Sequence, residues 1–190
     1  GITLLPSRDW LAENRKSFPP LDIGRFWIYG AYVTDPVPEG KIGLKIDAGQ
    51  AFGSGTHATT YGCIMMLEKY CPERARLKMA DIGCGSGILA MAAAKIKPDA
   101  DIIAVDNDPL AVETTRENAA DNGVGSIIRF DLSDGYNADL VQNNAPYDVI
   151  LANILPSPLI EMAPDAIPCL AEGGIIILSG LLDDQQDKVI

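Results

Sequence analysis

The chain has a single histidine, His57, and four cysteines, of which no two form a CxxC pair. Closely spaced cysteines and histidines are what a structural zinc site needs, so this kind of site has no support and we expect no metal. The dispersed cysteines indicate reduced thiols. Cys63 and Cys169 lie in apolar helical patterns, and we expect both in the core.

Basic residues and long apolar runs are also scarce. Lys and Arg number 15 against 26 Asp and Glu, which gives a net charge of -11. Phosphate backbones are bound by clustered cations, so we expect no direct nucleic acid partner, and a basic protein suits this charge better. No apolar run approaches the ~18 residues of a membrane span, and no signal sequence opens the chain. We therefore expect a soluble, cytoplasmic protein without a membrane partner.

Most of the chain alternates between short apolar strands and helices. Strands are expected over 79–82, 102–105, 127–130, 147–152 and 175–178. Helices are expected over 88–95, from Pro109 to Asn122-Gly123 with Asp108 as cap, and over 157–170 with an end at Gly173-Gly174. Buried strands separated by helices are typical of parallel sheets. The pattern predicts an α/β fold with a doubly wound, mostly parallel sheet.

The first 40 residues differ from the rest because they are rich in proline and aromatic side chains. We expect residues 1–40 to form an irregular linker or leading segment, and residues 41–190 to form the main domain. Within that domain, alternation over 42–46 predicts a strand with one buried face, and 59–70 has the spacing of an amphipathic helix. A further helix is expected from Asp183 onward.

The strongest motif is Asp81-Ile82-Gly83-Cys84-Gly85-Ser86-Gly87, between a predicted strand and a predicted helix. Glycines let the backbone turn tightly and approach a ligand, and the N-terminus of the following helix attracts negative groups. Nicotinamide enzymes use GxGxxG/A, whereas the third position here is Ile88. The GxGxG spacing therefore departs from the nicotinamide pattern.

Two polar residues follow later strands of the same predicted sheet. Asp106 comes 23 residues after Gly83, where an acid can accept both ribose hydroxyls of an adenosine; a turn is the alternative interpretation. Asn153 ends the fourth strand of this sheet, at the switch point where ligands bind in open α/β folds. Its amide can accept a hydrogen bond from an attacking amine, although an asparagine before Pro156 also favours a simple turn.

A glycine-rich loop runs from Asp47 to Thr60 and contains Phe52 and His57. No lysine follows its glycines, so it is not a P-loop. An aromatic residue among so many glycines favours a cover over a bound cofactor or substrate, rather than a plain linker. Without a nucleophile signature nearby, His57 is better interpreted as a hydrogen-bonding loop residue than as a general base.

Together, the segments 47–60, 81–89, 104–111, 152–159 and 178–181 resemble the ribosomal protein L11 methyltransferase family, and the similarity runs from about residue 9 to residue 190. The resemblance implies a class I fold and methyl transfer from S-adenosylmethionine to lysine side chains and the N-terminal amine of a large-subunit ribosomal protein. For this reaction, Asn153 and the backbone near Ile154 are our candidates for orienting the amine. The cofactor contacts that the resemblance implies are Thr60, Gly83, Asp106 and Asn153, with Phe52, Asp81 and Gly85 as neighbours.

The chain departs from the family pattern at both ends. The family's small N-terminal recognition domain has no counterpart here, and neither do the last two strands of the class I sheet, so we expect a C-terminally incomplete domain. Three other functions stay open: methyl transfer to another protein, a nucleobase or glutamine; NAD-dependent oxidoreduction; and a non-catalytic cofactor-binding fragment. Asn-Ile-Leu-Pro in place of Asn-Pro-Pro-Tyr disfavours the nucleobase and glutamine acceptors, and Ile88 disfavours NAD.

Overall fold

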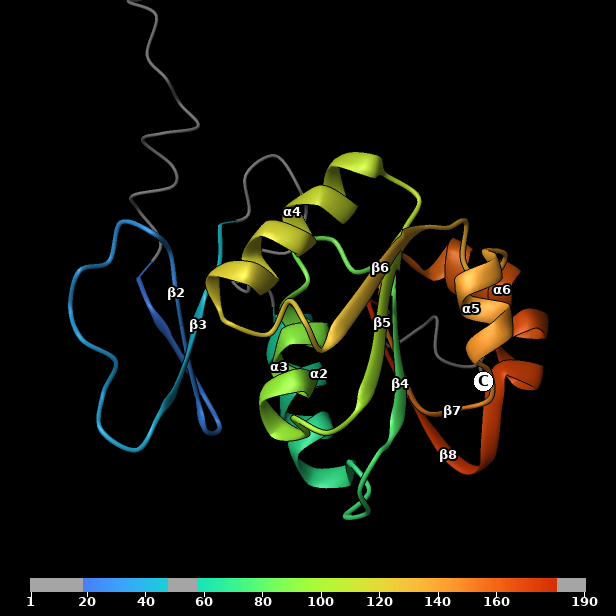
Figure 1. Ribbon diagram of the computed structural model, residues 1–190, viewed down its shortest axis with the longest axis horizontal. Coiled ribbons are helices and arrows are strands. Elements are labelled where there is room, and N and C mark those ends of the chain that lie inside the picture. The colour runs from blue at the N-terminus through green and yellow to red at the C-terminus, as the bar shows by residue number, and fades with distance from the viewer. Residues whose placement is uncertain (1–18, 48–57, 181–190) are drawn as a thin grey trace, which may run out of the picture.

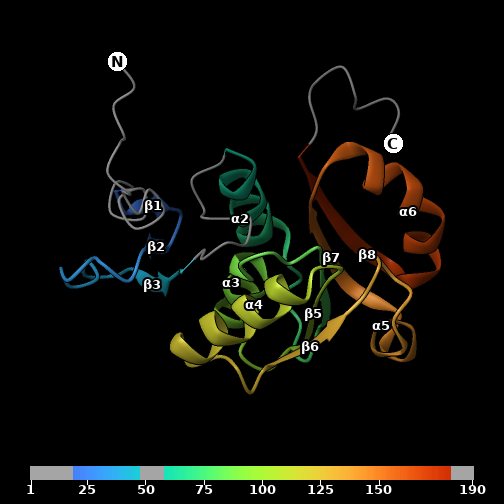
Figure 2. The same ribbon diagram turned by 90° about the horizontal axis from the view of Figure 1, so that it is seen from above.

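A computed structural model describes residues 19–47 and 58–180. A five-stranded, fully parallel sheet has the order β6-β5-β4-β7-β8, and a small sheet has the order β1-β2-β3. Figures 1 and 2 show α2, α3 and α4 on one face of the larger sheet and α5 and α6 on the other. The predicted doubly wound α/β fold is confirmed. Within the described residues, no helix has the length and apolar character to cross a membrane.

The elements of the larger sheet follow the predicted alternation of strand and helix. In chain order they are α2 (Ala58–Tyr70), β4 (Lys78–Ile82), α3 (Ile88–Ile96), β5 (Asp101–Asp106), α4 (Pro109–Asp121), β6 (Ile128–Leu132), α5 (Asp139–Asn144), β7 (Tyr147–Asn153), α6 (Pro156–Cys169) and β8 (Leu170–Ser179). The predicted cap of α4 is confirmed, because Asp108 accepts a hydrogen bond from the backbone N–H of Leu110. The short helix α5 was not predicted.

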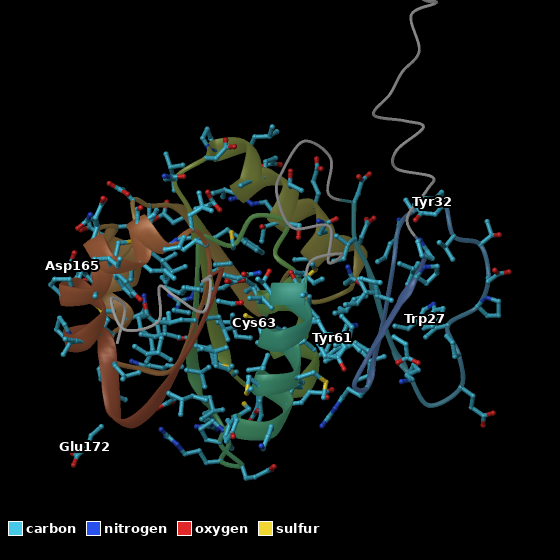
Figure 3. The ribbon with its side chains drawn as sticks, turned by 180° about the vertical axis from the view of Figure 1, so that it is seen from behind. Trp27, Tyr32, Tyr61, Cys63, Asp165 and Glu172 are labelled. Carbon is cyan, nitrogen blue, oxygen red and sulfur yellow. The ribbon has the colours of Figure 1, made fainter. Side chains whose placement is uncertain are left out.

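The core lies on both faces of the larger sheet, which explains the continuously apolar strands. Along β7, Val149 and Leu151 belong to the core beneath α2 and α3, whereas Ile150 and Ala152 belong to the core beneath α5 and α6. Figure 3 shows Cys63 on the side of α2 that faces this sheet. Cys63 and Cys169 are both buried, as predicted, and all four cysteines are free thiols.

The prediction of an irregular leading segment is wrong over residues 21–29. β1 (Leu21–Ile23) and β2 (Phe26–Tyr29) form an antiparallel hairpin, and β2 pairs in parallel with β3 (Ile42–Lys45). Phe26 and Ile28 are buried in the same core as Leu44, which is why these aromatic and β-branched residues adopt strands. The proposed domain boundary after residue 40 falls between β2 and β3 and stays a prediction.

The helix predicted over 157–170 corresponds to α6, but its predicted end at Gly173-Gly174 is wrong. The helix ends at Cys169, and both glycines lie inside β8. The pairing of β7 with β8 is irregular at this point, since Tyr147 pairs with Leu170 but Val149 pairs with Ile175. Glycine inside a strand commonly marks such a bulge. β8 is the edge of the sheet among the described residues, and the helix predicted from Asp183 lies outside them.

Two asparagines of α4 attach the small sheet to the larger domain. The Asn122 side chain bonds both the backbone N–H and C=O of Lys45, at 2.9 and 2.7 Å. The Asn118 side chain does the same for Asp47, at 3.0 Å in both bonds. On the other edge of β3, Ile42 and Ile46 donate to the hairpin. The two amides therefore occupy the position of a neighbouring strand at the edge of β3.

Candidate cofactor site

The carboxyl ends of β4, β5 and β7 surround one cavity of about 370 Å³. This volume is within the range of small-molecule sites, and its place at the switch point between β4 and β7 is the one expected for open α/β sheets. Of the predicted site residues, all those within the described part of the chain line it: Thr60, Asp81, Gly83, Gly85, Asp106 and Asn153. Phe52 and His57 lie outside the described residues.

The glycine motif forms the tight turn that its spacing predicts. Gly83, Gly85 and Gly87 all have left-handed backbones, with φ of 75°, 56° and 78°. Glycine is the one residue that adopts this conformation without strain. A side chain would also collide at the first position, because a Cβ on Gly83 would lie 2.4 Å from Cγ2 of Ile154. The GxGxG spacing is thus a requirement of the loop conformation.

Asp106 lies at the end of β5 with both carboxylate oxygens engaged by backbone groups. The N–H of Gly85 donates to Oδ2 at 2.9 Å, and the N–H of Asp108 donates to Oδ1 at 3.0 Å. These bonds fix the plane of the carboxylate before any ligand binds. Each carboxylate oxygen has two lone pairs, so a bidentate partner such as a pair of ribose hydroxyls can still be accepted.

Asp81 is the most deeply buried acid of the site, with 1% of its surface exposed at the end of β4. The pKa of its carboxyl group is raised to about 7, mainly by burial and also by the neighbouring charge of Asp106, while the hydrogen bond from the N–H of Ala90 opposes both. That N–H donates to Oδ2 of Asp81 at 2.9 Å and ties β4 to the first turn of α3. A cation entering the cavity would favour the ionised carboxylate.

Asn153, at the end of β7, and Thr60, in α2, contact each other in the lining of the cavity. The Nδ2 of Asn153 donates to Oγ1 of Thr60 at 3.3 Å, although the two residues are far apart in sequence. This bond sets the orientation of the amide, so that Oδ1 is the atom left to accept from a ligand N–H. Thr60 and Asn153 were each predicted as site residues, but the contact between them was not predicted.

Several cavity residues were not predicted. The apolar residues of the lining are Cys84, Ile88, Leu89, Ile154 and Leu155, and Thr59 and Gly180 complete it. Leu155 is 72% exposed at the N-terminus of α6. Gly180 has a φ of 93°, and a Cβ there would lie 2.0 Å from the carbonyl oxygen of Ile154. A glycine directly after an apolar run was the available sequence signal for this close approach.

Comparison with known proteins gives consistent matches. The model of the family "Ribosomal protein L11 methyltransferase" matches residues 2–190. The ribosomal protein L11 methyltransferase of Agrobacterium fabrum is 41% identical over 187 residues, which are 98% of this chain and 64% of that protein. The chain thus spans less than two thirds of the length of the first curated relatives that it matches.

Solved structures that resemble this chain include a member of the same family. The crystal structure of ribosomal protein L11 methylase from Lactobacillus delbrueckii subsp. bulgaricus has a TM-score of 0.79 and 30% identity, and the match covers 90% of this chain and 85% of that one. An RNA methyltransferase from Salinibacter ruber, solved with S-adenosyl-L-homocysteine, has a TM-score of 0.52 at 24% identity over 61% of this chain and 72% of that one. The second match reflects the fold alone.

Proposed function

Since the chain belongs to the ribosomal protein L11 methyltransferase family, we propose that it transfers a methyl group from S-adenosylmethionine to amino groups of a large-subunit ribosomal protein. The acceptors are lysine side chains and the N-terminal amine. One observation supports this proposal above all: Thr60, Gly83, Asp106 and Asn153, implied as cofactor contacts by sequence motifs, line a single cavity. A ribosomal substrate also favours a cytoplasmic location.

The residues of the cavity fit this cofactor. The carboxylate of Asp106 is held by backbone N–H groups and keeps lone pairs that can accept two ribose hydroxyls, and Gly83 and Gly85 add no side chain to the wall of the cavity. Thr60, Gly83, Asp106 and Asn153 would hold S-adenosylmethionine, which when bound supplies an electrophilic methyl carbon on a positively charged sulfur. Asp81 would place a carboxylate near that positive charge.

Positioning is the main contribution of the protein in this proposal. A methyl carbon on a sulfonium reacts without a metal, so holding the amine in line accounts for much of the rate. Oδ1 of Asn153 accepts one N–H of the amine, because Nδ2 is already engaged by Thr60. The backbone near Ile154 is the second candidate for orienting the amine.

The attacking amine must be neutral, whereas a free lysine has a pKa of about 10.4. The apolar lining contributed by Ile154 and Leu155 disfavours an ammonium ion by desolvation, and a cationic sulfur disfavours it further. Both effects lower the pKa of the amine as it enters. The displaced proton leaves to solvent, so no side chain has to serve as an obligatory general base.

Calorimetry tests the cofactor part of the proposal. S-adenosylmethionine and S-adenosylhomocysteine should bind with micromolar Kd, and NAD should not bind. The matched variants are Asp106→Ala, which removes the ribose acceptor, and Asp108→Ala, which removes only the cap of α4. Tighter binding of NAD than of S-adenosylhomocysteine would contradict the proposal.

Transfer of a labelled methyl group tests the acceptor. Purified ribosomal protein L11 should be labelled, and the same protein with its amines chemically blocked should not be. Labelling that survives the block would identify a different acceptor group. Binding of S-adenosylmethionine without any transfer would favour a non-catalytic, cofactor-binding chain.

A further inference from the structure

Two polar side chains of α4 are buried directly behind the glycine loop. Thr115 has 0% and Asn118 has 4% of its surface exposed, and neither lines the cavity. Burying a hydroxyl or an amide is unfavourable unless its hydrogen bonds are made inside the protein. Their partners therefore indicate what these two residues do.

Thr115 contacts the loop through both branches of its side chain. Its Oγ1 donates to the carbonyl oxygen of Gly85 at 2.9 Å and lies 3.3 Å from Sγ of Cys84. Burial raises the pKa of the Cys84 thiol, which stays protonated and can donate to Oγ1 in turn. The methyl group of Thr115 is so close to Gly87 that a Cβ there would lie 2.5 Å away.

Asn118 holds the next carbonyl group along the loop. Its Nδ2 donates to the carbonyl oxygen of Ser86 at 2.9 Å and to that of Asp47 at 3.0 Å. An amide nitrogen has two hydrogens, so these bonds use both of its donors. The consecutive carbonyl groups of Gly85 and Ser86 are thus bonded to neighbouring turns of one helix.

Glycine peptides can rotate with little steric resistance, so a loop with alternating glycines has several backbone conformations available. In a flipped peptide, a carbonyl oxygen would point into the cavity and repel the oxygens of a ribose or a carboxylate. The bonds from Thr115 and Asn118 oppose that flip, and they leave the N–H of Gly85 to donate to Asp106.

We propose that Thr115 and Asn118 are positioning residues that hold the glycine loop in its ligand-binding conformation before the cofactor arrives. Neither residue touches the ligand. They act through the peptides of Gly85 and Ser86, and through Gly85 they also fix the carboxylate of Asp106. The consequence for affinity rests on the proposed function, whereas the consequence for the loop conformation does not.

The test uses variants that separate the hydroxyl group from the methyl group. Thr115→Val and Thr115→Ala remove the bond to the Gly85 carbonyl, and Thr115→Ser retains it. Asn118→Ala removes the bond to Ser86. Asn122→Ala is the matched control at the C-cap of the same helix, because its amide bonds Lys45, the carbonyl group of Asn118 and the sulfur of Met91, and not the glycine loop.

The first measurement needs no ligand. Amide hydrogen exchange followed by NMR should be about tenfold faster at Gly85 and Gly87 in Thr115→Val, Thr115→Ala and Asn118→Ala, as loss of one buried hydrogen bond implies. Thr115→Ser and Asn122→Ala should exchange at the wild-type rate. Wild-type exchange without the Thr115 hydroxyl, or equal acceleration by Asn122→Ala, would overturn the proposal.

The second measurement is the calorimetric Kd for S-adenosylhomocysteine. We expect it to weaken about tenfold with Thr115→Val and to return to the wild-type value with Thr115→Ser. A wild-type Kd in Thr115→Val would overturn the link to affinity. If the wild-type chain itself binds no S-adenosylhomocysteine, the proposed function fails, and the exchange rates still decide the role of α4.

Discussion

Replacing Asp81 by asparagine should remove a pH dependence of cofactor binding near neutrality. Burial raises the pKa of this carboxyl group to about 7, so near neutral pH it is protonated in about half of the ligand-free molecules. The sulfonium and ammonium groups of S-adenosylmethionine are positive and favour the ionised form. Binding below pH 7 is therefore coupled to the release of a proton.

The size of the effect follows from this pKa. If only the ionised form binds well, the affinity is proportional to the fraction of Asp81 that is ionised. That fraction, and with it the affinity, falls about tenfold from pH 8 to pH 6. The raised pKa of Asp81 has the opposite effect on stability, which decreases as the pH rises, whereas the affinity increases. The folded state holds its proton up to about pH 7 and the unfolded chain loses it near 3.8, so the free energy of unfolding falls across that interval by roughly 4 kcal/mol.

Calorimetric titration with S-adenosylmethionine at pH 6, 7 and 8 measures the dependence, and buffers with different heats of ionisation count the protons released. Asp81→Asn retains an oxygen acceptor for the N–H of Ala90 but cannot titrate. Any protonation of S-adenosylmethionine itself contributes equally to the wild-type and Asp81→Asn titrations, so the difference between the two reports on Asp81. Asp148→Asn is the control, since Asp148 is buried but does not line the cavity. A wild-type affinity that is constant from pH 6 to pH 8 would refute the reasoning.

The remaining predictions concern single side chains of the cavity and its surroundings. Asp106→Ala should weaken cofactor binding by about 1.5–3 kcal/mol in calorimetry, whereas Asp108→Ala should leave binding unchanged and lower stability by about 1 kcal/mol in urea; the reverse pattern would mean that the two acids are swapped. Asn153→Ala should lower kcat far more than cofactor affinity, and an unchanged kcat with saturating cofactor would remove it from the site. Gly180→Ala should lower stability and cofactor affinity through a backbone collision, whereas Gly173→Ala, also at positive φ but with nothing within 4 Å, should show only the strain of about 1–3 kcal/mol in thermal unfolding. Equal losses in the two glycine variants would argue against the collision.

The parallel sheet was predictable because its signals are local. β4, β5 and β7 contain short apolar runs bounded by turn residues, and Asp108 and Pro109 mark the start of α4 by residue type alone. The ends of such strands meet at one edge of a sheet. The sequence positions of Asp81, Asp106 and Asn153 therefore sufficed to predict that they would lie close together.

The features that were missed depend on pairing between distant segments. The hairpin of β1 and β2 is short, and its strands are stabilised by β3 and by the shared core, which no local pattern contains. Gly173-Gly174 resembled a helix stop because glycine favours both C-caps and strand bulges. A helix of six residues such as α5 has too few turns to show periodicity.

Within the site, the contributions of α4 could not be derived from sequence. Thr115 and Asn118 are ordinary polar residues in a helix, and their partners are carbonyl groups whose directions exist only once the glycine loop has folded. The contact between Thr60 and Asn153 likewise requires α2 to pack beside the end of β7. The sequence identified groups that line the cavity, but not those that hold them in place.

Where β3 is attached beside α4, backbone hydrogen bonds hold the strand and buried side chains set its register. In the segment that they attach, Asn118 and Asn122 bond the main chain of residues 45 and 47 and no side chain. They would therefore accept almost any extended segment, and they do not distinguish a strand from the same strand shifted by two residues. Selection of the register falls to Leu44 and Ile46, whose buried side chains occupy the core. Truncating both would leave β3 attached but free to slip, and one slip of two residues would displace the start of the following glycine-rich loop by about 7 Å.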